Sequence, residues 1–331
     1  MSSVSFTAID LFCGCGGLSL GFQNAGFNIV AAFDNWDKAL NIYRKNFQHP
    51  AFNVDLACPD NFKILAEFNP DFILAGPPCQ DFSSAGKRNE NLGRANLTVR
   101  FAEIVSQIKP SWFVMENVKG ADKKKKYREA RSHLKSAGYG LTEMTLRASL
   151  CGVPQDRYRF FCIGHLHDRD EILTPYLQNN LTDTPLSVRE YLGDSLDIEH
   201  YYRHPRTYSR RAIFSIDEPS PTVRGVNRPI PKNYRSHPGD TAQVCEGVRP
   251  LTTIERSWLQ TFPKDFIFTG SKTDLEQAIA NAVPVKLAEY VAKCILDYLD
   301  DRHQNSPPPS PTQLCLPLDR PTNPSEYGFP N

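Results

Sequence analysis

A cysteine at position 79 stands in GPPCQDFS (residues 76–83), directly after two prolines. Each proline fixes its own φ angle, so the backbone that leads to the thiol has little freedom. The preceding run, DFILA, is apolar in the manner of a buried strand. A thiolate is a strong nucleophile that must be held in position to attack, whereas a structural cysteine needs no such mounting. The sequence therefore predicts that Cys79 is a catalytic nucleophile at the end of a strand.

Other polar residues that suit this chemistry follow later in the chain. Glu116 lies in MENVKG at the end of another apolar run, where it can serve as an acid or as a hydrogen-bond partner near the thiol. Three polar residues alternate in PQDRYRF, so a strand would place Gln155, Arg157 and Arg159 on one face. A polar ladder on the protein surface is the alternative interpretation of that alternation.

A glycine-rich turn joins a strand-like run to a helix-like run in DLFCGCGGLSLGF (10–22). Such a turn lets a nucleotide-like ligand approach the backbone. The dinucleotide fingerprint fails here, because Ser19 stands where G-x-G-x-x-G requires its last glycine after Gly14 and Gly16; the third glycine is Gly17. An ordinary tight turn is the other interpretation.

Acidic and aromatic residues follow the next strand-like runs. Asp34 comes roughly 20 residues after the glycine turn, a spacing that suits hydrogen bonding to ribose hydroxyls. Trp36 can offer its face to an adenine ring, or it can be an ordinary core or surface aromatic. Asp55 can accept a hydrogen bond from an adenine amino group, or it can cap a helix. These residues are compatible with a ligand that contains adenosine.

The elements that must position these residues alternate between strand-like and helix-like runs. Strands are predicted at 6–12, 27–33, 71–76 and 112–118, and helices at 17–26, 37–47 and 98–109. This alternation is typical of an α/β, doubly wound, mostly parallel sheet with helices on both faces. In such a sheet ligands bind beyond the carboxyl ends of the strands, where the cysteine, glutamate and glycine motifs all fall.

The alternation stops after residue 165. Residues 166–272 are rich in Arg, Pro, Tyr and His and predict a second, smaller domain. A helical pattern interrupted at Pro284 then returns, so 1–165 with 273–303 should form the first domain. Residues 304–331 contain eight prolines and predict an extended or disordered tail.

The composition narrows the possible partners. The 331 residues carry a net charge of +1 and contain no run of eighteen apolar residues, which excludes a transmembrane helix and a membrane partner. The first residues lack the features of a signal peptide, and the nine cysteines are expected to be free thiols in the cytoplasm. One C-x-C pair without a second pair does not predict a metal site.

The stretch 203–235 holds eight Lys or Arg against two acids, an excess that suits binding to a polyanion. A second basic run, 119–135, is either a solvated helix face or a nucleic-acid contact.

Eight motifs in order, from about residue 6 to 300, resemble the cytosine-C5 methyltransferases of the bacterial DNA-modifying kind. They are DLFCGCGGLSLGF, FDNWDKA, GPPCQDFS, MENVKG, GVPQDRYRFF, EPSPTVRG, RPLTTIERSWLQTFP and QAIANAVP. The resemblance implies a Rossmann-like catalytic domain that binds S-adenosylmethionine, releases S-adenosylhomocysteine and needs no metal. It also makes 166–272 a target-recognition domain.

The resemblance further implies which residues hold the cofactor. Asp34 would bind its ribose, Trp36 its adenine face and Asp55 the adenine amino group. Asn281 and Val283 would close over it from the returning helical region. The full implied set is Phe12, Gly14, Gly16, Gly17, Asp34, Trp36, Asp55, Leu56, Pro77, Asn281 and Val283.

The implied reaction gives Cys79 a purpose. Its thiolate would add to C6 of a cytosine flipped out of double-stranded DNA, Glu116 would hydrogen-bond N3, and Arg159 would hold O2, with Gln155 and Arg157 completing the catalytic set. Residues 83–94 would form a loop that closes on DNA. The implied setting is a bacterial monomer paired in function with a restriction endonuclease of the same specificity.

Two departures and three alternatives stand beside this interpretation. Family members usually have glycine where Ala280 stands, and the variable recognition segment is short, at about fifty residues. A family branch that methylates tRNA usually carries Cys-Phe-Thr in its recognition region, which is not found between 166 and 272. A nicotinamide-dependent oxidoreductase would not explain Cys79 or Glu116. A catalytically idle DNA-binding protein would need no thiol.

Overall fold

The computed structural model describes residues 5–78, 96–207, 209–244 and 247–305. Its centre is a seven-stranded sheet with the order β3-β2-β1-β4-β5-β8-β6. The strands are β1 (Thr7–Leu11), β2 (Asn28–Asp34), β3 (Ala51–Asn53), β4 (Phe72–Ala75), β5 (Trp112–Val118), β6 (Tyr139–Arg147) and β8 (Tyr158–Leu166). β1 to β5 pair in parallel, and β8 runs antiparallel to β5 and β6. The predicted mostly parallel sheet is confirmed.

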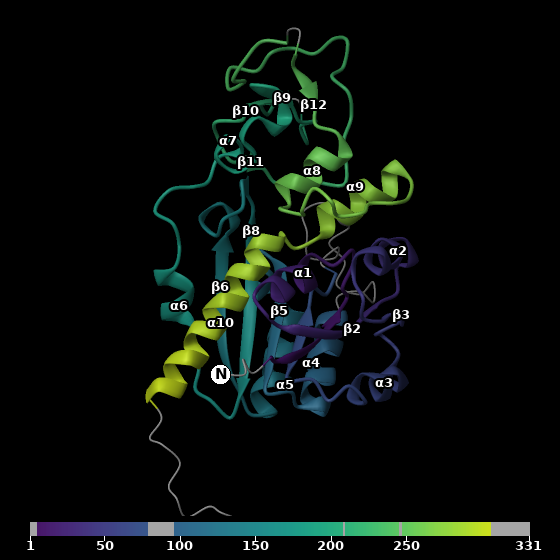
Figure 1. Cartoon of the computed structure of the whole chain (residues 1–331), viewed down its shortest axis with the longest axis vertical. Coiled ribbons are helices and arrows are strands. Elements are labelled where there is room, and N and C mark those ends of the chain that lie inside the picture. The colour runs from purple at the N-terminus through teal and green to yellow at the C-terminus, as the bar shows by residue number, and fades with distance from the viewer. Residues whose placement is uncertain (1–4, 79–95, 208, 245–246, 306–331) are drawn as a thin grey trace, which may run out of the picture.

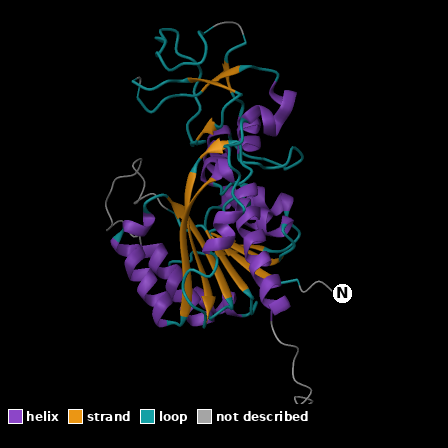
Figure 2. Cartoon of the chain, turned by 90° about the vertical axis from the view of Figure 1, so that its left-hand side faces the viewer, coloured by secondary structure: helices purple, strands orange, loops and turns teal. Residues whose placement is uncertain are grey.

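Helices cover both faces of this sheet (Figures 1 and 2). They are α1 (Gly17–Asn24), α2 (Asp37–Asn46), α3 (Phe62–Ala66), α4 (Asn96–Ile108), α5 (Lys125–Ser136), α6 (Thr174–Asn179) and α10 (Val285–Asn305). Short 3₁₀ turns occur at Pro59–Asn61, Ala121–Lys123, Ala148–Leu150 and Gly193–Leu196. None of the described helices is long and apolar enough to cross a membrane.

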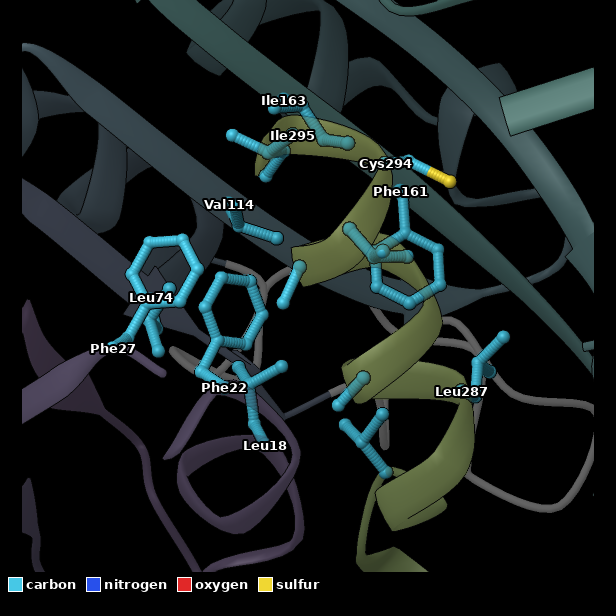
Figure 3. Packing of buried hydrophobic residues seen from close by; sticks show 14 of the residues in the cluster. Leu18, Phe22, Phe27, Leu74, Val114, Phe161, Ile163, Leu287, Cys294 and Ile295 are labelled. Atoms are coloured by element: carbon cyan, nitrogen blue, oxygen red, sulfur yellow. The ribbon is translucent and has the colours of Figure 1, made fainter. Parts of the chain in front are cut away.

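Alternate residues of the strands enter two different cores, as the twofold period of a strand requires. In β4, Phe72 and Leu74 pack with α1 and α10, whereas Ile73 and Ala75 pack with α4 and α5. Figure 3 shows the first of these cores, where Phe22 of α1 lies near Leu74 and Ile295 of α10 lies near Val114. Burial on both faces explains why the strands read as continuous apolar runs.

The upper part of the molecule in Figure 1 has little regular structure. Three short strands form a sheet in the order β10-β9-β12, and a two-residue strand, β11, pairs with β7. The elements are β7 (Gln155–Asp156), β9 (His200–Tyr202), β10 (Ile213–Ser215), β11 (Ser220–Pro221), β12 (Arg249–Pro250), α7 (Val188–Leu192), α8 (Thr253–Leu259) and α9 (Lys272–Asn281). Pro284 separates α9 from α10, as the sequence predicts.

Packing crosses the predicted domain boundaries at two places. Leu173 and Leu177, at α6, belong to the core that contains α10, although the prediction assigns them to the second domain. Conversely, Ile279 of α9 packs with Val188 and Leu259 of the upper part. The division at residues 166 and 272 stays a prediction, and the two parts share an apolar junction.

Candidate active site

Three motifs meet at the carboxyl ends of β1, β4 and β5, because neighbouring parallel strands end at the same edge of the sheet. The Gly76 amide donates a hydrogen bond to the Leu11 carbonyl at 3.3 Å. A Cβ atom on Gly76 would lie 3.8 Å from Glu116 Oε2 and 4.0 Å from the Phe12 carbonyl oxygen. The described chain reaches Pro78; Cys79 and the predicted closing loop, 83–94, lie outside the described residues. Gly76, three residues before Cys79, is therefore beside Glu116.

Glu116 and Arg159 form a buried ion pair at this edge. Antiparallel pairing of β5 with β8 places the two side chains together, with Arg159 Nε 2.7 Å from Glu116 Oε1. Glu116 is 7% exposed. Burial raises the pKa of Glu116 above its ordinary value, against the opposing charges of Arg159 and Arg157. The carboxyl group therefore retains a proton more readily than an exposed glutamate, as suits an acid.

Gln155 and Arg157 are fully buried, which excludes the surface-ladder interpretation for both. The Arg157 guanidinium donates hydrogen bonds to backbone carbonyls of Val223, Ala280 and Ala282, at 3.4, 3.0 and 3.2 Å. The side chain of Gln155 donates to the Leu259 carbonyl at 3.0 Å and accepts from the Val223 amide at 2.9 Å.

The side chains of these two residues do not lie on one strand face with that of Arg159, because the chain kinks between β7 and β8. The Arg157 amide donates to the Gln155 carbonyl at 2.9 Å, a bond that an extended strand does not make. Sequence alternation alone did not reveal this kink. The structure thus gives Gln155 and Arg157 contacts that hold neighbouring segments together, and it gives Arg159 the contact with Glu116.

Replacing Arg157 with methionine is expected to destabilise the protein by about 3–5 kcal/mol, because it leaves buried carbonyl groups without their donor. Urea unfolding measures this change. Arg147→Met is a suitable control, since Arg147 pairs with Asp156 at a partly exposed site. The control should change stability by less than about 1 kcal/mol. Equal stability of Arg157→Met and wild type would contradict the structural role.

The glycine turn contains one residue that faces open space. Gly14 has φ +55°, and no atom lies within 4 Å of the position that a Cβ would take. Its amide donates to Asp34 Oδ2 at 2.8 Å, while Asp34 Oδ1 accepts from the Trp36 amide at 2.8 Å. Burial raises the pKa of Asp34, and these backbone donors oppose the rise. Phe12 also has a positive φ, +58°, which is uncommon for an aromatic residue and marks a constrained turn.

The other two glycines of the turn are required by packing. A Cβ on Gly16 would lie 2.4 Å from the ring of Phe47, and a Cβ on Gly17 would lie 2.1 Å from the Val283 carbonyl oxygen. The turn therefore rests against the α9–α10 corner, in which Asn281 is exposed and Val283 is buried. This contact joins parts of the chain that are far apart in sequence.

The remaining predicted cofactor residues surround the same edge. Asp55 is exposed and accepts a hydrogen bond from the Ala57 amide at 3.0 Å, so it caps its own loop. Leu56 is buried beside it, and Trp36 is half-buried at the start of α2. Pro77 is buried, with its carbonyl 3.4 Å from Asn117 Nδ2. The open space at Gly14, next to an oriented carboxylate, fits a ligand with ribose hydroxyls.

Two functional contributions escaped sequence reasoning. Asn117, within the MENVKG motif, links β5 to Pro77, two residues before Cys79, and its place in that motif was the available signal. Ser19, noted only for breaking a fingerprint, donates to Asp10 Oδ2 at 2.5 Å and accepts from the Tyr43 hydroxyl at 2.7 Å. A buried polar network therefore lies under the glycine turn. No cluster of three or more metal-ligating side chains occurs among the described residues.

The ionisation of Asp10 should make stability depend on pH. Burial raises the pKa of Asp10 from 3.8 to about 7, since the side chain is fully buried. Burial disfavours the ionised form of Asp10. The resulting loss of unfolding free energy is therefore absent below the ordinary pKa and complete above about pH 7. Asp10→Asn should remove this loss, and its unfolding free energy relative to wild type should increase from pH 4 to pH 7.5. Asp60→Asn, at an exposed position, should show no such trend; a parallel pH dependence of Asp10→Asn and wild type would contradict the assignment.

Comparison with known proteins identifies the family. The chain matches the family described as C-5 cytosine-specific DNA methylase over residues 6–297. It is 57% identical to the type II methyltransferase M.HindV of Haemophilus influenzae, over 88% of this chain and 96% of that protein. It is also 57% identical to M.HgiDI of Herpetosiphon aurantiacus, over 88% and 94%. A solved structure described as S. pombe Dnmt2 methyltransferase shares the fold, with a TM-score of 0.66 and 20% identity over 89% of this chain and 99% of that chain. The chain therefore belongs to the C-5 cytosine-specific DNA methylase family and is a DNA (cytosine-5-)-methyltransferase.

Proposed function

We propose that this enzyme methylates C5 of a cytosine flipped out of a short, specific double-stranded DNA sequence, through a covalent bond between Cys79 Sγ and C6. The observation that carries the proposal is the buried Glu116–Arg159 pair beside Gly76, where the cysteine loop begins. A perturbed acid next to a cation at a ligand-binding edge is typical of a catalytic site. A protein that only bound DNA would have no use for it.

The reaction follows from the poor nucleophilicity of C5 in cytosine. Addition of the Cys79 thiolate to C6 moves the electron pair of the C5–C6 double bond to C5, while Glu116 protonates N3 and Arg159 binds O2. S-adenosylmethionine, when bound, supplies an electrophilic methyl group that C5 accepts. A base then removes the C5 proton, the electron pair returns to the C5–C6 bond, Cys79 leaves as a thiolate, and N3 gives its proton back to Glu116. The raised pKa of Glu116 supports its role as the acid.

The residues around the glycine turn support S-adenosylmethionine as the cofactor. Asp34 is oriented by two backbone amides and can accept bonds from ribose hydroxyls beside the open side of Gly14. Trp36 and Asp55 would contact the adenine ring, and Val283 would cover the turn from the α9–α10 corner. This assignment follows the predicted set, and the packing of Gly17 on Val283 supports it.

We further propose that the enzyme protects host DNA from a restriction endonuclease of the same specificity. The two relatives at 57% identity are named type II methyltransferases, which supports this setting. The tRNA alternative is not favoured, since the likeness to Dnmt2 at 20% identity concerns the fold alone. Two predicted properties, action as a monomer and a cytoplasmic location, remain part of this proposal.

The test offers purified enzyme and methyl-labelled S-adenosylmethionine to unmethylated duplex plasmid DNA and, separately, to bulk tRNA. Label is expected in DNA alone, and mapping of the methylated cytosines gives the recognised sequence. Label in tRNA alone would overturn the DNA assignment. DNA already methylated by the enzyme is the matched control, and it should take up no further label.

A further inference from the structure

A buried carboxyl group lies beneath the glycine turn and has no part in the reaction described above. Asp10 is fully buried on β1, two residues before Phe12. The Ser19 hydroxyl donates a hydrogen bond to Asp10 Oδ2, whereas Oδ1 has no hydrogen-bond partner in the described part of the chain. A buried carboxylate oxygen without a partner is costly, because it has lost its contact with water. The packing of the core alone does not account for this group.

A second carboxyl group, that of Asp34, lies close to Asp10. Asp10 pairs with Ala32 in the β1–β2 ladder, and Asp34 follows Ala32 by two residues, so both side chains lie on one face of the sheet. Burial, opposed by the Ser19 hydrogen bond and reinforced by the charge of Asp34, raises the pKa of Asp10 to about 7. No Lys or Arg among the described residues contributes to the electrostatic environment of either carboxyl group.

The other titratable neighbours of these carboxyl groups carry no charge near neutral pH. The Tyr43 hydroxyl donates to Ser19 and lies 2.7 Å from His49 Nε2. Burial raises the pKa of Tyr43 well above its ordinary value and lowers the pKa of His49 to about 4, so both side chains are neutral. Burial also raises the pKa of the Cys13 and Cys15 thiols. The region beneath the turn is therefore negative, and no cationic side chain of the described residues balances it.

We propose that Asp10 is a counter-charge for the sulfonium group of S-adenosylmethionine, that it acts through space from beneath the glycine turn, and that it favours this cofactor over its product. The open space beside Gly14, whose amide donates to Asp34, is the proposed place of the cofactor. S-adenosylmethionine carries a positively charged sulfur, whereas S-adenosylhomocysteine carries a neutral thioether. A negative site without a cation of its own favours the charged ligand. The inference rests on the proposed cofactor and adds to it a specificity residue that does not touch the ligand.

Methyl transfer removes the charge that Asp10 attracts. Before the reaction the cofactor is a cation, and a nearby carboxylate stabilises its complex with the enzyme. After the reaction the sulfur is neutral, so the same carboxylate no longer strengthens binding. The charge of Asp10 therefore favours the exchange of product for fresh cofactor.

The test measures the affinities of S-adenosylmethionine and S-adenosylhomocysteine by calorimetry between pH 5.5 and pH 8. Both ligands carry the same amino-acid group, so the ratio of their dissociation constants isolates the charge on sulfur. Asp10 ionises over this range, and the wild-type preference for S-adenosylmethionine should increase with pH by roughly five- to tenfold, because one charge pair within about 12 Å contributes about tenfold at an effective dielectric constant of about 20. Asp10→Asn should give a ratio that is independent of pH. The matched control is Asp183→Asn, at an exposed residue, which should behave as wild type.

The outcomes separate this inference from the proposed function. If wild type binds both ligands but the ratio does not change with pH, or if Asp10→Asn shows the same pH dependence as wild type, the inference is overturned and the proposed cofactor stands. If wild type binds neither ligand, the proposed cofactor and the inference are both overturned.

Ser19→Ala keeps the carboxyl group and tests whether it is the titrating one. The Ser19 hydrogen bond opposes the rise in the pKa of Asp10, so its loss should raise that pKa further. The preference for S-adenosylmethionine should then develop at a higher pH than in wild type. An unchanged midpoint would assign the pH dependence to another group, such as Asp34, and would overturn the inference. Because this variant retains Asp10, it also decides the question if Asp10→Asn does not fold.

Discussion

Replacement of Cys79 by alanine is expected to abolish methyl transfer, with a loss on the order of 10⁴-fold or more, as when other enzymes lose their nucleophile. Without the thiolate, no electron pair reaches C5, and the remaining groups can only position the base. Cys79 itself lies outside the described residues, but the residues that lead to it are described. Pro77 accepts a hydrogen bond from Asn117, and Gly76 lies near Glu116, so the residues that lead to Cys79 lie beside the predicted acid.

The variant should still bind its ligands. In the proposed function, S-adenosylmethionine would be bound by the glycine turn and Asp34, and DNA by the basic segment 203–235, and the substitution alters neither of them. Calorimetry and DNA retardation should therefore give wild-type affinities beside a lost single-turnover rate. Cys58→Ala is the matched control, since Cys58 is an exposed free thiol that should be dispensable. Appreciable methylation by Cys79→Ala would contradict the covalent mechanism.

The arrangement of the catalytic edge was predictable from the sequence because it follows from local patterns. The apolar runs that became β1, β4 and β5 are buried on both faces, and parallel strands bring their carboxyl ends together. Glu116 and Gly76 therefore had to meet, whatever the details of the side chains. The glycine turn next to Asp34 follows from the same rule.

Contacts between distant segments were not predictable in this way. The polar residues of PQDRYRF alternate, which predicted that their side chains share one strand face. A kink at Arg157 instead directs its side chain to the carbonyls of Val223, Ala280 and Ala282. No local signal encodes partners that lie 66 to 125 residues away.

Replacement of Glu116 by glutamine is expected to lower the single-turnover rate by about 10²–10⁴-fold, the usual contribution of a positioned general acid. Glutamine keeps the shape of the side chain and can donate a hydrogen bond to N3, but it has no proton to transfer. The ion pair with Arg159 is lost as well, so the affinity for DNA should also fall. This fall in affinity should be smaller than the fall in the single-turnover rate. Glu129→Gln, at an exposed residue that pairs with Lys126, should behave as wild type.

The pH profile separates the loss of an acid from a merely structural effect. Burial raises the pKa of Glu116, and the reaction needs the protonated form, so the wild-type rate should fall as pH rises through that pKa. Ionisation of the Cys79 thiol acts in the opposite direction, since only the thiolate attacks. The wild-type profile should therefore be bell-shaped, and Glu116→Gln should keep the rising limb and lose the falling one. A variant that is slow but still bell-shaped would assign the falling limb to another group and leave Glu116 a positioning role through Arg159.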